Sequence, residues 1–225
     1  IDFGDLNQTT KAHAGASSST IAAFGGGQEP YDTVEKITIA SQGNAVDYAD
    51  MSVSRGYMAG LSNSVKGVFA GGATPSNSNV IDEFRIATGG TFTDFGDAQA
   101  AKSGVMGNTS AHGGLNDGYQ GTRIAPIPTG LGVGQRALAA GGFTGGQPTI
   151  EEFNMTTTGN ASQFGSLAVG SYEVSAMSNT TRCLFAGGEN PSGDTDRIEY
   201  VEFASKGNGA DFGNLLEAKD GVTGG

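Results

Sequence analysis

The chain has few of the residues that most metal sites and covalent cross-links require. Its 225 residues include no tryptophan, one cysteine (Cys183) and two histidines (His13 and His112). A single thiol cannot form an intrachain disulfide, and a local zinc or copper motif needs several histidines or cysteines. We therefore interpret Cys183 as a buried structural thiol and expect neither a disulfide framework nor a transition-metal motif.

Positive charge and long apolar runs are also scarce. The chain has 12 Lys and Arg against 23 Asp and Glu, which gives a formal net charge of −11. Binding to a phosphate backbone needs clustered cations, and a membrane-spanning helix needs an apolar run of roughly 18 residues or more. The sequence therefore predicts no nucleic-acid partner and no membrane insertion.

Helical periodicity is absent, while glycine is abundant. Glycine accounts for 39 residues, and no segment places apolar residues at the i, i+3, i+4 and i+7 positions of an amphipathic helix. Several segments alternate as strands do, for example Val80–Ala87, in which Val80, Asp82, Phe84 and Ile86 share one face. The fold class expected is all-β.

Two short phrases recur along the chain in step with each other. The spacing of the second phrase gives a period of 45 to 48 residues, with one longer unit of 69 residues. A repeat of this length composed of short strands is typical of β-propeller blades. The first phrase is Phe24-Gly25-Gly26-Gly27, Phe69-Ala70-Gly71-Gly72, Ala139-Ala140-Gly141-Gly142 and Phe185-Ala186-Gly187-Gly188, and the second begins at Asp2, Asp47, Asp94, Gln163 and Asp211.

One unit divides into four expected strands: 57–62, 66–72, 80–87 and 91–97. The first is rich in small residues, which suits an innermost strand where neighbouring units converge. The glycine pair that ends the second lets the backbone turn at φ values that a residue with a Cβ resists. We therefore expect the four glycine pairs to occupy equivalent positions, with small residues such as Ala59 and Ser62 lining the centre.

The glycine pair and the third strand together resemble the kelch repeat family. The third-strand segments are Val34-Glu35-Lys36-Ile37, Ile81-Asp82-Glu83-Phe84, Ile150-Glu151-Glu152-Phe153 and Ile198-Glu199-Tyr200-Val201. The resemblance implies a kelch-like β-propeller of four-stranded antiparallel blades. The usual kelch tryptophan is missing, so we expect the aromatic residue of the second phrase to replace it, buried between blades: Phe3, Tyr48, Phe95, Phe164 and Phe212.

The resemblance covers nearly the whole chain and implies a single propeller domain over 1–225. Its repeats are expected at about 2–46, 47–93, 94–162, 163–210 and, in part, 211–225. The chain opens inside an outer-strand phrase and stops inside an expected inner strand, so we expect a segment of a longer protein with at least four to five blades.

The third unit carries 23 extra residues, and the insertion lies near 111–135. It is either a long surface loop or a degenerate blade, and its two closely spaced prolines favour a loop. Irregular loops on regular scaffolds commonly bind ligands. The candidate binding residues are His112, Asn116, Tyr119 and Arg123, whose aromatic and polar groups suit a glycan or protein contact.

Cofactors are not expected, although one loop has oxygen-bearing side chains at alternate positions. Asn190, Asp194 and Asp196 form a weak calcium candidate, because calcium prefers oxygen ligands. The bidentate glutamate that closes an EF-hand loop is missing and the equivalent loops do not share the pattern, so an ordinary polar turn is the favoured interpretation.

The linkers 157–162 and 205–210 resemble kelch-type repeats of virion proteins from tailed bacteriophages. That resemblance implies a non-enzymatic structural or adhesion protein of the virion, in a tail fibre, a tail tip or a capsid decoration. Its expected partners are other virion or fibre subunits and a host-surface glycan or protein, and its expected location is virion or extracellular. The alternatives are a cellular extracellular or fibre-forming kelch-repeat protein and a propeller enzyme that acts on glycans.

Overall fold

Four antiparallel four-stranded sheets, numbered here in chain order, account for most of the structure. This computed structural model describes residues 2–29, 31–63, 65–110, 136–143 and 145–221, and the regular elements there are all β-strands. The sheets comprise β1 (Ala14–Ser17), β2 (Ile21–Gly25), β3 (Thr33–Thr38) and β4 (Val46–Asp50); β5 (Ala59–Ser62), β6 (Lys66–Ala70), β9 (Val80–Arg85) and β11 (Thr93–Asp97); β12 (Met106–Thr109), β13 (Arg136–Ala140), β14 (Thr149–Asn154) and β15 (Ser162–Ser166); and β16 (Ser175–Ser178), β17 (Arg182–Ala186), β20 (Arg197–Glu202) and β21 (Ala210–Asn214).

The remaining strands are short. Two hairpins, β7 (Ala73–Thr74) with β8 (Ser76–Asn77) and β18 (Glu189–Asn190) with β19 (Gly193–Asp194), separate the second and third strands of sheets 2 and 4. β10 (Gly90–Thr91) pairs in parallel with β4 and so links sheets 1 and 2. No helix within the described ranges is long and apolar enough to cross a membrane.

All four sheets use the same register, which confirms that one unit is repeated. In each sheet, the next-to-last residue of the second strand lies opposite an acidic residue of the third strand. Phe69 lies opposite Asp82, for example, and Phe185 lies opposite Glu199. Each pairing of third and fourth strands also has an irregularity at the same place. The expected strand order within each unit is therefore confirmed.

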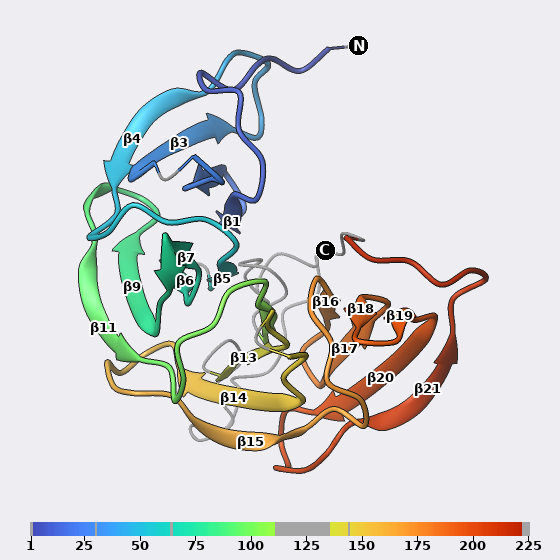
Figure 1. The fold of residues 1–225 in the computed structure, drawn as a ribbon. Helices are drawn as coiled ribbons and strands as arrows, with labels where there is room; N and C mark the ends of the chain where they lie inside the picture. Colours follow the sequence, from blue (N-terminus) through green and yellow to red (C-terminus); the bar gives the residue numbers. More distant parts are fainter. Residues whose placement is uncertain (1, 30, 64, 111–135, 144, 222–225) are drawn as a thin grey trace, which may run out of the picture.

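The sheets stand around an open arc, with the first strand of each sheet innermost (Figure 1). Hydroxyl groups link these inner strands across the sheets. The Ser17 N–H donates to Ser62 Oγ (3.1 Å), the Thr109 hydroxyl donates to the Ser62 carbonyl (2.6 Å), and the Ser178 hydroxyl donates to the Thr109 carbonyl (2.7 Å). Small residues are needed here because a larger side chain would separate strands that approach this closely.

Successive sheets are also joined at the outside, where the loop before one outer strand binds the outer strand of the preceding sheet. Between sheets 2 and 3, the Gly159 N–H donates to the Phe95 carbonyl (2.8 Å), and the Asp97 N–H donates to Asn160 Oδ1 (3.1 Å). Between sheets 3 and 4, the Ser166 N–H donates to Asn208 Oδ1 (3.1 Å). We call this arrangement the outer joint.

Residues 2–5 form the same outer joint with sheet 1, although no sheet of the described chain precedes it. The Gly43 N–H donates to the Phe3 carbonyl (2.9 Å), and the Asp5 N–H donates to Asn44 Oδ1 (3.1 Å). The segment thus occupies the place of an outer strand from a further sheet.

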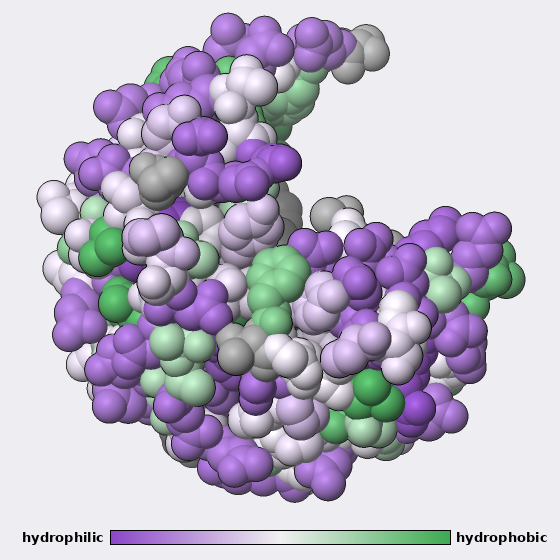
Figure 2. Space-filling view, viewed as in Figure 1, coloured by the Kyte–Doolittle hydropathy of each residue, from purple (hydrophilic) through white to green (hydrophobic). Residues whose placement is uncertain are grey.

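We expected the aromatic residue of the second repeated phrase to be buried between units. This prediction holds for the sheets inside the arc and is wrong at the two ends of the arc. Phe95 and Phe164 are 2% and 4% exposed, and Tyr48 is half-buried. Phe3 and Phe212 are 39% and 55% exposed, because the described residues include neither the other strands of the sheet to which Phe3 would belong nor a sheet that follows Phe212. Figure 2 shows the wide notch between the two ends of the arc.

The four glycine pairs lie in equivalent left-handed turns, as expected. The first glycine of each pair has φ between +67° and +86°. A Cβ at Gly26 would lie 2.6 Å from Met58 Cε and would overlap the Arg55 carbonyl oxygen. The turn therefore needs glycine both for its backbone conformation and for the close approach of the next sheet.

Gly26→Ala is accordingly expected to lower the free energy of unfolding by about 1–3 kcal/mol, the usual range for a strained backbone position. Gly207→Ala is the control, because no heavy atom lies within 4 Å of a Cβ at that site, and its effect should stay within about 0.5 kcal/mol. Urea unfolding curves of both variants provide the comparison, and equal stabilities would contradict the role assigned to Gly26.

The insertion near 111–135, with His112, Asn116, Tyr119 and Arg123, lies outside the described residues. Its flanks are placed: Thr109 of β12 pairs with Ala137 of β13. In the other three sheets the same two strands are also paired, and they are joined by a short turn. The insertion therefore replaces the turn between the first two strands of sheet 3.

Candidate functional site

A buried carboxylate recurs at one position of every sheet, on the third strand. Glu35, Asp82, Glu151 and Glu199 are 6%, 0%, 3% and 4% exposed. Each lies among apolar residues, where a charge is costly unless it has a partner. The sheets differ in how they supply that partner.

In sheets 2 and 3 the partner is a cation from the segment that enters the sheet. Arg55 Nη1 lies 3.0 Å from Asp82 Oδ2, and neither side chain is exposed. Lys102 Nζ lies 2.8 Å from Glu151 Oε1, also buried. Burial lowers the pKa of the Arg55 guanidinium, and the Asp82 carboxylate opposes that shift.

In sheets 1 and 4 the entering segment has no cation at this position. Thr10 and Ser171 stand where sheets 2 and 3 have Arg55 and Lys102. Glu35 accepts a hydrogen bond from the Asn7 N–H (3.0 Å), and Glu199 accepts one from the Ala168 N–H (2.9 Å). Glu199 is also paired with Arg197 of its own strand.

Sheet 4 has a pocket of about 270 Å³, including space open to solvent, beside the buried Glu199 carboxylate. Apolar side chains form much of its wall, and the hydroxyl-bearing Ser171 and Thr195 contribute as well. Its lining residues are Leu167, Val169, Ser171, Val174, Phe185, Gly187, Thr195, Arg197 and Glu199.

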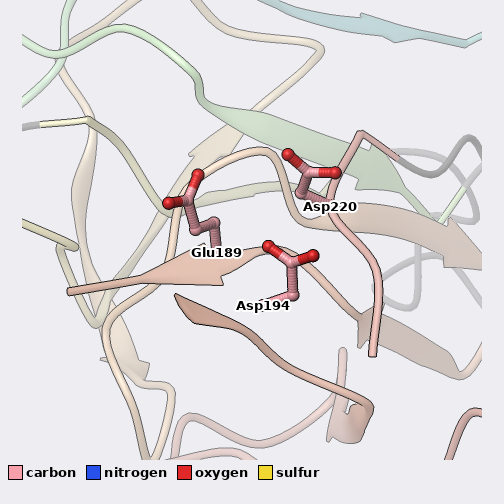
Figure 3. Close-up of side chains that lie close together, drawn as sticks. All are labelled: Glu189, Asp194 and Asp220. Atoms are coloured by element: carbon pink, nitrogen blue, oxygen red, sulfur yellow. The ribbon is translucent and has the colours of Figure 1, made fainter. Parts of the chain in front are cut away.

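Three further carboxylates gather on the same sheet, at the β18–β19 hairpin. Carboxylate oxygens of Glu189, Asp194 and Asp220 all lie within 4.8 Å of one another (Figure 3). Such oxygens are the ligands that calcium prefers, but exposed acidic groups of this kind are common without a bound ion.

The calcium candidate expected from the sequence is not assembled as such. Asn190 Oδ1 accepts a hydrogen bond from the Ser192 N–H (2.8 Å), as in an ordinary polar turn. Asp194 joins Glu189 and Asp220, whereas Asp196 does not belong to this group. Sequence reasoning missed Glu189 and Asp220: the first pairs with Asp194 across the hairpin, and the second arrives from a distant segment.

The acidic surroundings affect Glu173, beside the cluster. Its pKa is raised, chiefly by burial and then by repulsion from Asp220 and Glu189. The pKa of Tyr172 is also raised, with desolvation as the first cause and hydrogen bonding to Glu189 as the second. Negative charge therefore dominates this part of sheet 4.

Glu173→Gln is expected to raise the melting temperature at pH 7. A carboxyl with a raised pKa binds more protons in the folded state, so its contribution to stability falls as pH rises through the folded pKa. The advantage of the variant should therefore vanish near about pH 3, below the usual glutamate pKa. Thermal melting at several pH values tests this, with Glu217→Gln as a control because Glu217 is exposed and paired with Lys219 (3.3 Å).

Cys183 and His13, which the sequence offers as possible metal ligands, both pack against other parts of the protein. Cys183 is fully buried, and burial raises the pKa of its thiol, which confirms the interpretation as a structural residue. The His13 ring packs edge-on against Phe24, with ring centroids 6.0 Å apart.

No protein-family model and no curated protein matches the sequence. Among solved structures, the chain is similar to the structure of YjhT, with a TM-score of 0.68 and 12% sequence identity. The similarity covers 96% of this chain and 69% of YjhT. It supports the coarse fold, an all-β arrangement of four-stranded antiparallel sheets of the β-propeller type.

Proposed function

We propose that this chain is a non-enzymatic structural or adhesion component of a bacteriophage virion, in a tail fibre, a tail tip or a capsid decoration. Its sheets would be blades of a kelch-like propeller that displays loops to fibre subunits or to a host-surface glycan or protein. The observation that carries the proposal is a constant scaffold in which one unit bears a 23-residue insertion in place of a short turn. Additions of this kind commonly carry binding functions on regular scaffolds.

The exposed ends of the arc support the propeller part of the proposal. Phe3 and Phe212 are 39% and 55% exposed, whereas their counterpart Phe95 is 2% exposed inside the arc. Residues 2–5 already form an outer joint without the rest of a preceding sheet. Both ends thus present surfaces that fit a further repeat, and ring closure removes strand edges that otherwise invite aggregation.

Immunogold electron microscopy of purified virions, with antibodies raised against this chain, tests the location. Labelling at a constant position on the particle supports the proposal, and absence of the chain from purified particles overturns it. A glycan array and a pull-down with host-surface extract then compare the intact chain with a variant lacking 113–133.

Thr20→Ala is the matched control, because Thr20 lies in the turn of sheet 1 that corresponds to the insertion. We expect the deletion to remove binding without unfolding the sheets, and the control to bind normally. Hydrolysis of a bound glycan would contradict the non-enzymatic assignment.

A further inference from the structure

The pocket of sheet 4 corresponds to the space that a lysine or arginine side chain fills in sheets 2 and 3. The equivalence is set by the backbone: the second glycines of the first three pairs donate their N–H groups to the carbonyls of Arg55 (3.2 Å), Lys102 (2.8 Å) and Ser171 (3.2 Å). These three residues therefore stand at one structural position. Arg55 and Lys102 reach from it to the buried carboxylate, and the Ser171 side chain is too short to do so.

The residues that line the pocket of sheet 4 also correspond to residues around Arg55 in sheet 2. Phe185 and Glu199 of the pocket correspond to Phe69 and Asp82, and the Arg55 guanidinium contacts both of the latter, donating to the Phe69 carbonyl at 3.3 Å. Leu167, Val169 and Val174 add an apolar lining. The pocket thus combines apolar walls, which suit a methylene chain, with a buried carboxylate, which suits a cation.

We propose that this pocket binds a lysine side chain of a partner protein, with the ammonium at Glu199 and the methylene stem against the apolar walls. Lysine fits better than arginine because the repeat pairs its longer acid with lysine, in Lys102–Glu151, and its shorter acid with arginine, in Arg55–Asp82. The proposal goes beyond the display function and does not depend on the virion setting.

The charge around the pocket favours the same ligand. The hairpin that carries Glu189 and Asp194 runs between Gly187 and Thr195, which both line the pocket. Asp220 completes the acidic cluster at this hairpin. Carboxylates of one sign near a pocket raise the local concentration of cations and speed their association.

Arg197 is the resident competitor for Glu199. It lies two residues earlier on β20, pairs with the Glu199 carboxylate and keeps 40% of its side chain exposed. An entering ammonium therefore shares the carboxylate with Arg197 or displaces the guanidinium toward solvent. Removal of Arg197 should strengthen binding.

The test titrates the chain with N-acetyl-lysine-N-methylamide, followed by NMR chemical shifts, and uses the norleucine analogue as a neutral ligand of similar shape. The lysine compound should bind at least roughly tenfold more tightly than the norleucine compound, a difference of about 1.4 kcal/mol. Ser171→Lys should fill the pocket and abolish binding, and Thr20→Ala, which lies outside the pocket lining, should bind as the unmodified chain does. Arg197→Ala should bind several-fold more tightly.

Three results would overturn the proposal: equal binding of the two ligands, unchanged binding to Ser171→Lys, and binding to Arg197→Ala without binding to the unmodified chain. The third would show that Arg197 already occupies the site. Ser171→Met is the second blocking variant in case Ser171→Lys does not fold, and it should also abolish binding. Circular dichroism spectra establish that each variant is folded.

Discussion

Arg55→Met is expected to lower the free energy of unfolding by about 3–5 kcal/mol, the range for removal of one partner from a buried ion pair. The Arg55 and Asp82 side chains are both fully buried. The substitution would leave Asp82 charged in an apolar environment, with Ser52 as its remaining side-chain donor (2.6 Å). The cost arises mainly from that uncompensated charge, because methionine fills much of the arginine volume.

Chemical denaturation monitored by circular dichroism measures the effect. Arg182→Met is the matched control, since the Arg182 and Glu202 side chains are 45% and 40% exposed, and its cost should stay below about 1 kcal/mol. Arg55→Met combined with Asp82→Leu should recover part of the lost stability. Equal effects at Arg55 and Arg182 would show that burial does not govern these pairs.

Phe95→Ala is expected to cost about 3–5 kcal/mol, the range for truncation of a buried phenylalanine. The Phe95 ring is 2% exposed and packs edge-on against Phe153 of sheet 3, with ring centroids 5.5 Å apart. Its removal would leave a cavity between sheets 2 and 3, so it should weaken the contact between sheets as well as the strand that carries it.

Phe212→Ala provides the comparison within the same repeat. Phe212 holds the corresponding place on β21 but is 55% exposed, so its truncation removes little buried surface. Thermal melting should show a large shift for the first variant and a small one for the second. A large shift at Phe212 would indicate that another molecule covers that end of the arc in solution.

The sequence was sufficient to predict the sheets because their determinants are local and repeated. Alternation along Val80, Asp82 and Phe84 indicates one face of a strand, and the spacing of the glycine pairs sets the unit. The same alternation placed Asp82 on the apolar face, where the structure has it. The identity of its partner was not predictable, because Arg55 arrives from a different segment of the unit and the pair forms only when the sheet is assembled.

The exposed ends and the acidic cluster were missed for a similar reason. The phrase around Phe212 is nearly identical to that around Phe95, and the difference in burial depends on whether another sheet follows in space. Asp220 joins Glu189 and Asp194 because the Lys219 carbonyl accepts the Gly188 N–H (2.8 Å). Neither contact leaves a pattern along the sequence.

Because the outer joint links each sheet only to the sheets beside it, the unfolding of one sheet is coupled mainly to the unfolding of its neighbours. Sheets 1 and 2 are joined at the outside by the pairing of β10 with β4, and the later sheets by backbone and asparagine hydrogen bonds, so the loss of one sheet weakens its neighbours first. Chains built in this way unfold progressively, as linear repeat proteins do. In hydrogen-exchange experiments, amides of β9 and β14 in the middle of the arc should therefore exchange most slowly. Those of β21, which no further sheet follows among the described residues, should exchange early.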